Sequence, residues 1–425
     1  MKVLVIGGGG REHALSWALA RDPDVSEILA MPGNPGIAQL ARIEPGSLED
    51  LEGSVALANR ETPDLVVIGP EAPLVSGLAD RLRAAGHRVF GPGADAARLE
   101  GSKAFAKRVM ASARIPTARS GSFSSVEEGM TLVDQLGGRA VVKADGLAAG
   151  KGVIVAGDRD TARQALEACL DRRVFGEAGE RVVIEEVLEG QEASAFALAD
   201  GANAMPLALA QDFKRVGDGD TGPNTGGMGA YSPLPWLDGA AEASIWKEIA
   251  EPAIAAMTAT GAPYSGALFA GLILTTEGPK VLEFNCRFGD PETETLMPRI
   301  RSGLARTLLA CATGDLTGTD IDVSSGACVT VVLASGGYPG KHPTGLPIQG
   351  LDAVAKMEGV HVFHSGTSLR DGRVVTAGGR VLAVSALGGS VADARGIAYE
   401  AIGSIRFEGM SFRRDIAAGA EGEQS

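Results

Sequence analysis

The sequence predicts a multidomain protein that combines the α/β and α+β classes, and three observations lead to this prediction. Short apolar runs alternate with helical patterns over the first hundred residues, which is typical of a parallel α/β sheet. This alternation stops near Gly101, and strands and helices then follow in mixed order. The length of 425 residues suits two or three domains, each with its own core.

The first region, residues 1–101, is expected to form the parallel sheet. Its expected strands are Val3–Ile6, Ile28–Met31, Leu65–Ile68 and Arg88–Phe90, and its clearest helices are Glu12–Arg21 and Ser76–Ala85. Ligands of such sheets bind at the carboxyl ends of the strands, where the loops Gly7–Gly10 and 69–73 follow. With Arg11 at the start of a helix, the first loop predicts a phosphate site. It does not predict a dinucleotide site, because Glu12 stands where that fingerprint needs glycine.

The second region, residues 102–320, begins with a helix expected over Lys103–Arg114 that ends before Pro116. Residues 119–188 are expected to form a compact β-α-β-α-β lobe that moves separately. The following elements are two strands within Gln191–Asp212, a helix over Ala240–Thr260, strands over Ala267–Thr276 and Lys280–Asn285, and helices within Glu292–Gly314. The loop 214–229 is long enough to predict a functional role.

The third region, residues 321–425, is expected to be a smaller α+β unit. Its expected elements are a strand over Cys328–Ala334, a hairpin around Arg373–Ala386 and a helix over Val391–Ile405.

The segment 139–153 carries the strongest chemical signal in the chain. Lys143 ends a β-branched run that enters a glycine-rich loop, and Lys151 lies between Gly150 and Gly152 in that loop. Glycines let backbone N–H groups approach phosphate oxygens, and lysines supply positive charge. This pattern predicts a polyphosphate site.

A second signal lies about 140 residues downstream, in the strand that ends at Asn285. Strict alternation along this strand predicts that Val281, Glu283 and Asn285 share one face, with Leu282 and Phe284 on the opposite, apolar face. A carboxylate and an amide oxygen on one face suit Mg²⁺ bound to nucleotide phosphates. Together the two segments indicate an enzyme that uses a nucleoside triphosphate.

The segment 183–192 has two interpretations that the residues alone leave open. Its carboxylates follow an apolar strand, so they fit a solvated strand exit. They equally fit a hinge whose backbone contacts adenine while Glu192 accepts from ribose hydroxyls.

Composition excludes several classes of function. A net charge of −14 and only 4% aromatic residues argue against a nucleic-acid surface. The four cysteines lack C-x-x-C spacing, so neither a zinc site nor a disulfide framework is predicted. No apolar run is long enough to span a membrane and no export signal is found, so we expect a cytoplasmic protein.

Five motifs give the chain a close resemblance to the phosphoribosylamine–glycine ligase family, ATP-grasp enzymes of purine biosynthesis. The motifs are Gly9–Ala14, Gly69–Leu74, Lys143–Gly152, Asp220–Tyr231 and Glu283–Glu292. The resemblance extends from Met1 to about Ile416. It implies a pre-ATP-grasp domain over 1–101, an ATP-grasp domain over 102–320 with a mobile B lobe at 119–188, and a C-terminal domain over 321–425.

The resemblance also implies the reaction. ATP drives the ligation of glycine to 5-phosphoribosylamine through glycyl phosphate, which gives glycinamide ribonucleotide, ADP and phosphate, with Mg²⁺ or Mn²⁺ as the metal. The implied partners are these small molecules, and we expect a monomer in at most transient contact with the preceding enzyme of the pathway.

Site residues follow from the resemblance at matching positions. Those implied for ATP are Lys103, Lys143, Gly150, Lys151, Gly152, Glu185, Glu186, Val187, Leu188 and Glu192, and those for the metal are Glu283 and Asn285. Those implied for the substrates are Gly9, Gly10, Arg11, Glu71, Asp212, Lys214, Asn224, Thr225, Gly226, Gly227, Met228, Arg287, Gly289 and Asp290. Catalytic roles are implied for Lys143, Arg287 and Asp290.

Three positions depart from the family pattern. Phe213 stands where many members have histidine, Glu294 stands where glutamine is common, and Ala270–Gly271 replaces a further metal carboxylate of other ATP-grasp families. Two alternatives stay open at this point: another ATP-grasp ligase of a phosphoribosyl compound, which substrate dependence would reveal, and a non-catalytic nucleotide sensor, which would show no turnover.

Overall fold

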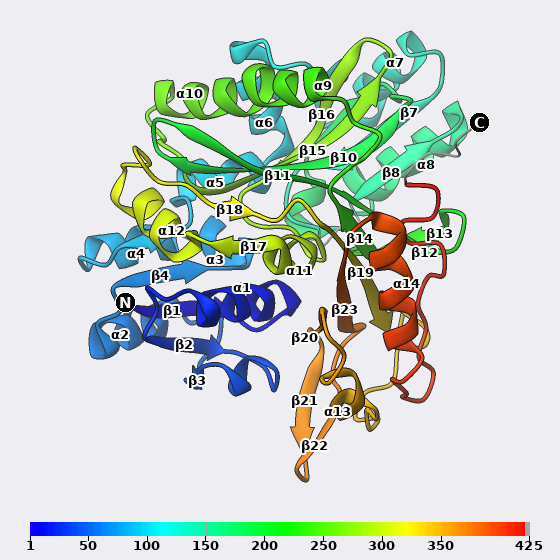
Figure 1. The fold of residues 1–425 in the computed structure, drawn as a ribbon. Helices are drawn as coiled ribbons and strands as arrows, with labels where there is room; N and C mark the ends of the chain where they lie inside the picture. The colour runs from blue at the N-terminus through cyan, green and yellow to red at the C-terminus, as the bar shows by residue number, and fades with distance from the viewer. Residues whose placement is uncertain (149–151, 421–425) are drawn as a thin grey trace.

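The computed structural model describes residues 1–148 and 152–420, and the chain begins with the expected parallel sheet (Figure 1). Its strand order is β3-β2-β1-β4-β5. The strands are β1 (Lys2–Gly7), β2 (Glu27–Pro32), β3 (Arg42–Ile43), β4 (Leu65–Ile68) and β5 (Val89–Phe90), and the helices are α1 (Gly10–Arg21), α2 (Leu51–Glu61), α3 (Glu71–Val75), α4 (Leu78–Ala84) and α5 (Ala94–Gly101). The helix predicted over Ser76–Ala85 is confirmed as α4, which begins two residues later because Gly77 at φ +86° precedes its first turn, and the short helix α3 before it was not predicted.

The order of these strands creates a switch point between β1 and β4. The chain proceeds outward from β1 to β2 and β3, then returns to the other side of β1 with β4. The loops after β1 and β4 therefore lie side by side at the carboxyl edge of the sheet, where ligands of such folds bind. This confirms the expected placement of the loops Gly7–Gly10 and 69–73.

The lobe at 119–188 has a four-stranded antiparallel sheet in the order β6-β9-β7-β8. Its elements are β6 (Ser120–Phe123), α7 (Val126–Gln135), β7 (Ala140–Ala144), β8 (Val153–Ala156), α8 (Arg159–Leu170) and β9 (Val182–Glu185). The predicted β-α-β-α-β pattern missed β8, which pairs with β7 and makes the glycine-rich loop a hairpin connection. The lobe has a hydrophobic core of its own.

The body and the C-terminal region share one eight-stranded sheet in the order β16-β15-β10-β11-β14-β19-β23-β20. Pairing of β14 with β19 carries this sheet across the boundary expected near residue 320. The strands are β10 (Gln191–Asp200), β11 (Ala204–Asp212), β14 (Gly229–Ser232), β15 (Ser265–Thr275), β16 (Gly278–Asn285), β19 (Ala327–Ala334), β20 (Val360–His364) and β23 (Arg380–Gly388).

Helices and short hairpins complete this part. The main helices are α6 (Lys103–Ala113), α9 (Gly239–Ile245), α10 (Glu251–Ala259), α11 (Glu292–Leu296), α12 (Leu304–Thr313), α13 (Leu351–Val354) and α14 (Val391–Ile402). The hairpins are β12 (Arg215–Gly217) with β13 (Thr221–Asn224) and β21 (Thr367–Arg370) with β22 (Arg373–Thr376), and β17 (Ile300–Ser302) pairs with β18 (Asp322–Val323). The predicted loop 214–229 thus contains a short hairpin. Helix α14 packs on β19 and β23 (Figure 1).

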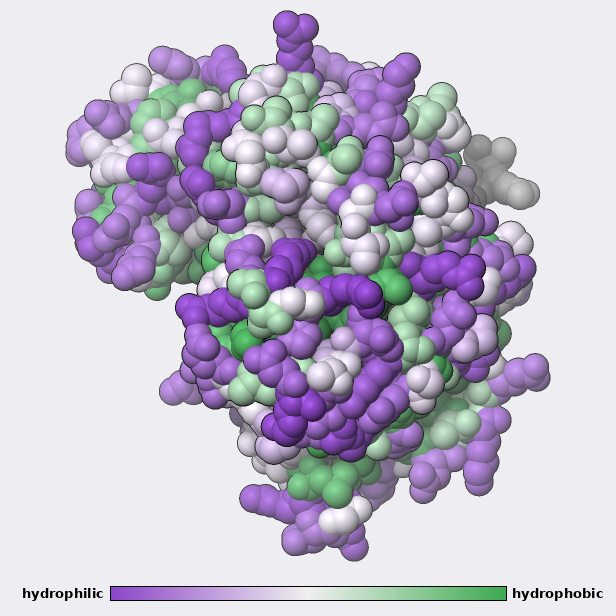
Figure 2. Space-filling view, turned by 90° about the vertical axis from the view of Figure 1, so that its left-hand side faces the viewer, coloured by the Kyte–Doolittle hydropathy of each residue, from purple (hydrophilic) through white to green (hydrophobic). Residues whose placement is uncertain are grey.

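A continuous core fixes the N-terminal sheet against the body. Val3 and Val5 of β1 belong to the same buried cluster as Phe196 of β10 and Phe269 of β15. The rings of Phe196 and Phe269 stack with their centroids 4.6 Å apart. On the face shown in Figure 2 hydrophilic side chains predominate and hydrophobic ones are scattered. Among the described residues, no helix is long and apolar enough to cross a membrane.

Candidate active site

Lys143, near the end of β7, reaches from the lobe to the body. Its ammonium group donates to the backbone carbonyl of Leu282 at 2.9 Å and forms an ion pair with Glu185 at 3.0 Å. The lysine is buried. Since Leu282 precedes Glu283 in β16, this contact brings the predicted ATP lysine to the predicted metal strand.

Lys103 begins α6 and lies near the same place. Its ammonium group donates to the carbonyl of Gly146 at 3.1 Å. Burial lowers the pKa of Lys103, while the nearby carboxylate of Glu283 opposes this shift and Lys143 adds to it. The two lysines and Glu283 therefore share one electrostatic environment, as a site for a metal-bound triphosphate requires.

The glycine-rich loop begins and ends in defined contacts. Asp145 accepts hydrogen bonds from the Ser102 hydroxyl at 2.9 Å and from the N–H of Ala104 at 3.0 Å, which ties the loop to the first turn of α6. At the other end, the carbonyl of Gly152 accepts from the N–H of Ala144 at 2.8 Å. Two of the predicted ATP contacts, Gly150 and Lys151, lie outside the described residues.

The strand β16 corrects the predicted alternation of its side chains. Glu283 lies opposite Gly271 but Val281 lies opposite Leu272, so a bulge at Leu282 adds one residue to β16. Val281 and Phe284 consequently belong to the same buried core, and the prediction that Val281 shares a face with Glu283 is wrong.

Glu283 and Asn285 are the oxygen donors available on this strand. Among the described residues, neither side chain has a hydrogen-bond partner, and Glu283 is half-buried while Asn285 is 7% exposed. Across the described part of the chain there is no group of three or more His, Cys, Asp or Glu residues that could hold a metal ion. Two uncommitted oxygen donors fit a hard cation that completes its coordination shell with phosphate and water.

The predicted adenosine hinge follows β9. Glu185 is buried and pairs with lysines, and its backbone is held within the lobe sheet opposite Ser120 and Val141. The carboxylate of Glu186 accepts from the N–H of Arg119 at 2.8 Å. Val187 and Leu188 follow outside any strand and are half-buried. Because Val187 and Leu188 lie outside the strands, their backbone is the part of this segment that could contact an adenine base.

The two loops of the N-terminal sheet meet through Arg11. Its guanidinium group donates to the carbonyl of Gly69 at 3.0 Å and to Glu12 at 3.1 Å, and Glu12 accepts from the N–H of Gly9 at 2.7 Å. Burial raises the pKa of Glu12, and Arg11 opposes this shift. The arrangement brings the predicted residues Gly9, Gly10 and Arg11 to the start of the second loop.

Arg287 joins Glu71 to a residue that sequence reasoning missed. It donates to Glu71 at 3.2 Å and to Glu100 at 3.0 Å, and these ion pairs connect the segment just after β16 to helices α3 and α5. Burial alone would raise the pKa of Glu71, but Arg287 and Arg11 lower it below its ordinary value. Glu71 is therefore an anion that already has a cationic partner.

A partly exposed acidic cluster surrounds Lys214, whose own side chain is 39% exposed. Its ammonium group contacts Glu192 at 2.7 Å and Asp212 at 2.8 Å. Burial raises the pKa of Asp212, and burial together with Asp212 raises the pKa of Glu292 to about 7. Glu292 accepts a hydrogen bond from the Ser194 hydroxyl at 3.1 Å. Glu292 was not among the predicted site residues, although it ends the quoted motif.

Arg380 connects the loop 224–228 to the predicted residue Asp290. It hydrogen-bonds to the carbonyl of Gly226 and, at 2.7 Å, to the carbonyl of Asp290, and its ion pair with the Asp290 carboxylate is 3.2 Å long. Gly289 precedes Asp290, and a Cβ on it would lie 2.3 Å from the carboxylate of Glu292. Sequence reasoning missed Arg380, which follows Asp290 by 90 residues.

The remaining loop residues differ in how they are placed. The Thr225 hydroxyl donates to the carbonyl of Lys214 at 2.8 Å and accepts from the N–H of Gly227 at 3.0 Å. Asn224 ends β13 and is half-buried. Met228 is 1% exposed and belongs to the hydrophobic core, so its side chain packs inside instead of contacting a ligand.

Glu294 is an anomaly at the junction of the three regions. It is fully buried and both carboxylate oxygens lack a hydrogen-bond partner within the described chain. A Cβ on Gly10 would lie 2.2 Å from one of these oxygens and 2.5 Å from the Ser365 hydroxyl, so only glycine fits there. Burial, together with the nearby Asp290, raises the pKa of Glu294 well above its ordinary value.

We expect Glu294→Gln to stabilise the fold more at pH 8 than at pH 5. The unfolded chain releases the Glu294 proton near pH 4.3, whereas the folded chain holds it to higher pH, so stability falls as pH rises above about 4.3. A glutamine amide does not titrate in this range, so this pH-dependent loss of stability disappears. Melting temperatures of both proteins at the two pH values test this, and an equal difference at both would contradict it.

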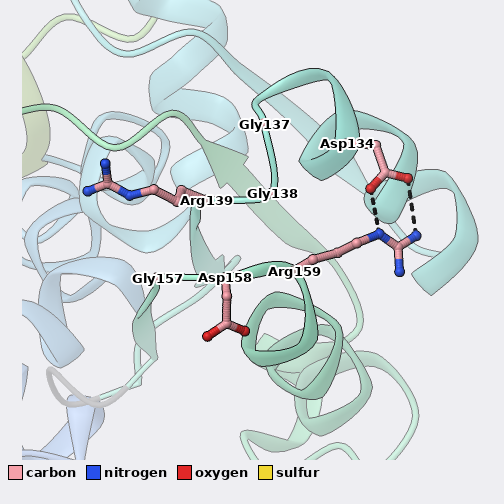
Figure 3. A pocket seen from close by; sticks show the side chains of 7 residues that line it. All are labelled: Asp134, Gly137, Gly138, Arg139, Gly157, Asp158 and Arg159. Carbon is pink, nitrogen blue, oxygen red and sulfur yellow. Dashed lines mark hydrogen bonds and ion pairs between the residues drawn. The ribbon is translucent and has the colours of Figure 1, made fainter.

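A surface hollow in the lobe lies away from all these residues. Figure 3 shows it between the turn before β7 and the turn after β8, with the Arg159–Asp134 ion pair at its edge. Because β7 and β8 are antiparallel, this hollow is at the opposite end of the hairpin from the glycine-rich loop. It is not part of the candidate active site.

Models of one protein family match three successive parts of the chain. They describe phosphoribosylglycinamide synthetase: its N domain matches residues 1–100, its ATP-grasp (A) domain residues 101–293 and its C domain residues 328–419. These ranges together cover most of the chain.

Individual proteins give the same result. A phosphoribosylamine–glycine ligase of Streptomyces coelicolor is 51% identical over 425 residues, which is 99% of this chain and 100% of that protein. One of Agrobacterium fabrum is 50% identical over 416 residues, which is 98% of each chain.

Solved structures extend the comparison to the fold. The crystal structure of phosphoribosylamine–glycine ligase from Thermotoga maritima matches with a TM-score of 0.85 and 34% identity, covering 98% of this chain and 100% of that one. A biotin carboxylase domain of Hydrogenobacter thermophilus matches with a TM-score of 0.73 over 96% of this chain and 91% of that one, at 17% identity, which is a likeness of fold alone.

Proposed function

Because the chain belongs to the phosphoribosylglycinamide synthetase family, we propose that the residues gathered between its lobe, body and N-terminal sheet form one ligase active site. The chain is an ATP-dependent carbon–nitrogen ligase that joins glycine to 5-phosphoribosylamine in purine biosynthesis. One observation carries the assignment of residues. Lys143, in β7 just before the glycine-rich loop, contacts the carbonyl of Leu282 at 2.9 Å, beside Glu283.

The chemistry needs positioned charge and no protein nucleophile. A glycine carboxylate oxygen attacks the γ-phosphorus of ATP, the bond to the bridging oxygen breaks, and ADP leaves from glycyl phosphate. The amine nitrogen of phosphoribosylamine then attacks the acyl carbon, and phosphate leaves as the amide forms and the nitrogen loses a proton. Closure of the lobe over the site would protect glycyl phosphate from water.

The ATP side of the site is assigned to the two lysines and the metal strand. Lys103 and Lys143 would contact phosphate oxygens, and the backbone at Val187 and Leu188 would contact the base. Glu283 and Asn285 would hold a divalent cation, for which we propose Mg²⁺, with Mn²⁺ as a substitute. When bound, the metal neutralises phosphate charge.

The substrate side is assigned to the N-terminal loops and the acidic cluster. Gly9, Gly10 and Arg11 would bind phosphoribosylamine, since the N-terminus of α1 attracts its phosphate. Asp212 and Lys214 supply opposite charges for the ammonium and carboxylate groups of glycine. The ion pairs of Arg287 with Glu71 and Glu100 support its assignment to this side of the site.

The first test is ADP release from Mg-ATP and glycine, with and without phosphoribosylamine formed in situ from ribose 5-phosphate and ammonia. We expect turnover only when both substrates are present. Turnover without glycine would instead indicate another ATP-grasp ligase, and no turnover under any condition would indicate a nucleotide sensor. We further propose that the protein acts in the cytoplasm as a monomer, in at most transient contact with the preceding enzyme.

A further inference from the structure

Two buried lysines share one carboxylate at the junction of lobe and body. Lys107 of α6 contacts one oxygen of Glu185 at 3.0 Å, and Lys143 of β7 contacts the other at 3.0 Å. The side chains are only 9%, 3% and 6% exposed for Lys107, Glu185 and Lys143 respectively. Lys107 is not among the residues proposed for the active site.

The group is connected to the metal strand on both sides. Lys107 also donates to the hydroxyl of Thr117 at 2.8 Å, and that hydroxyl donates to the carbonyl of Val281 at 2.6 Å. Lys143 donates to the next carbonyl, that of Leu282. The three charged side chains therefore link α6, the lobe and β16.

The charges in this group do not balance. Two ammonium groups face one carboxylate, so the group keeps one net positive charge in a buried place. Burial lowers the pKa of Lys107, and Glu185 opposes this shift. Without Lys107, Glu185 would neutralise Lys143 alone, and the charge that Lys143 offers to a phosphate would fall.

We propose that Lys107 is a positioning residue for the nucleotide: it shares Glu185 with Lys143, so that Lys143 keeps positive charge for the phosphates of ATP. This inference rests on the ATP site assigned above. It does not require Lys107 to contact ATP. It predicts that the effect of losing Lys107 depends on the presence of Glu185.

Calorimetric titration with Mg-ADP tests the proposal and needs no turnover, so it remains informative even if the ligase assignment fails. We expect Lys107→Met to weaken binding at least tenfold and Lys107→Arg to stay within threefold of the unchanged protein. Lys247→Met, at an exposed position of the body, is the matched control and should have no effect. In turnover, the KM for ATP should rise while the KM for glycine changes less than twofold.

The double variant decides whether charge is the reason. With Glu185→Gln already present, adding Lys107→Met should change Mg-ADP binding less than twofold. This comparison also holds if Lys107→Met alone does not fold. Binding of the single variant within twofold of the unchanged protein, or the same loss in both backgrounds, would overturn the proposal.

Discussion

Replacing Glu283 with alanine is expected to abolish turnover without destabilising the fold. The carboxylate has no hydrogen-bond partner among the described residues and would serve only as a metal ligand, so its loss removes several kcal/mol of charge stabilisation. Since about 1.4 kcal/mol corresponds to a tenfold change, the rate should fall on the order of a thousandfold. Stability should stay within about 0.5 kcal/mol, as for other substitutions that break no contact.

Glu277→Ala is a suitable control for this experiment. Glu277 precedes β16 and is exposed, and within the described ranges 1–148 and 152–420 its carboxylate pairs with Lys280 alone. Its loss should leave both turnover and melting temperature unchanged. Turnover by Glu283→Ala within a factor of ten of the unchanged protein would refute the metal assignment, and a large fall in its melting temperature would show a structural role instead.

Arg287→Met is expected to remove both activity and stability. Arg287 is the cationic partner of Glu71 and of the largely buried Glu100, and its loss leaves two carboxylates without that charge. Removing one partner of a buried ion pair costs about 3–5 kcal/mol. Thermal unfolding should therefore begin several degrees lower, in contrast with Glu283→Ala.

A second substitution separates the two effects of Arg287. Adding Glu100→Gln to Arg287→Met removes the carboxylate left unpaired, so part of the lost stability should return. Activity should not return, because the guanidinium group is still missing from the substrate region. An unchanged melting temperature in Arg287→Met, or recovery of turnover in the double variant, would contradict this account.

Much of the fold could be predicted because its signals are local. Apolar runs and glycine loops located the N-terminal sheet and the loops at its carboxyl edge, and the apolar run in residues 280–285 located β16. The bulge at Leu282 could not be predicted, since it depends on how β16 pairs with β15. A short strand such as β8 was hidden for a similar reason: its partner, not its own length, makes it a strand.

The candidate active site likewise contains some residues that the sequence reveals and others that it does not. Lys143 and Glu283 stand in motifs whose chemistry is visible in the sequence. Glu100, Arg380 and Lys107 do not, because each gains its place through a partner far along the chain: Arg287, Asp290 and Glu185. A single Glu, Arg or Lys outside any motif does not indicate a functional site. Its role becomes visible only when the fold brings it to its partner.

The central claim is that this chain joins glycine to 5-phosphoribosylamine through glycyl phosphate. Glycine labelled with ¹⁸O in its carboxylate tests it most directly, with the phosphate product analysed by ³¹P NMR. We expect one ¹⁸O atom to pass from each glycine to phosphate, and labelled phosphate to be released in step with glycinamide ribonucleotide. Phosphate without ¹⁸O would contradict it, because ATP would then be cleaved without activation of the glycine carboxylate.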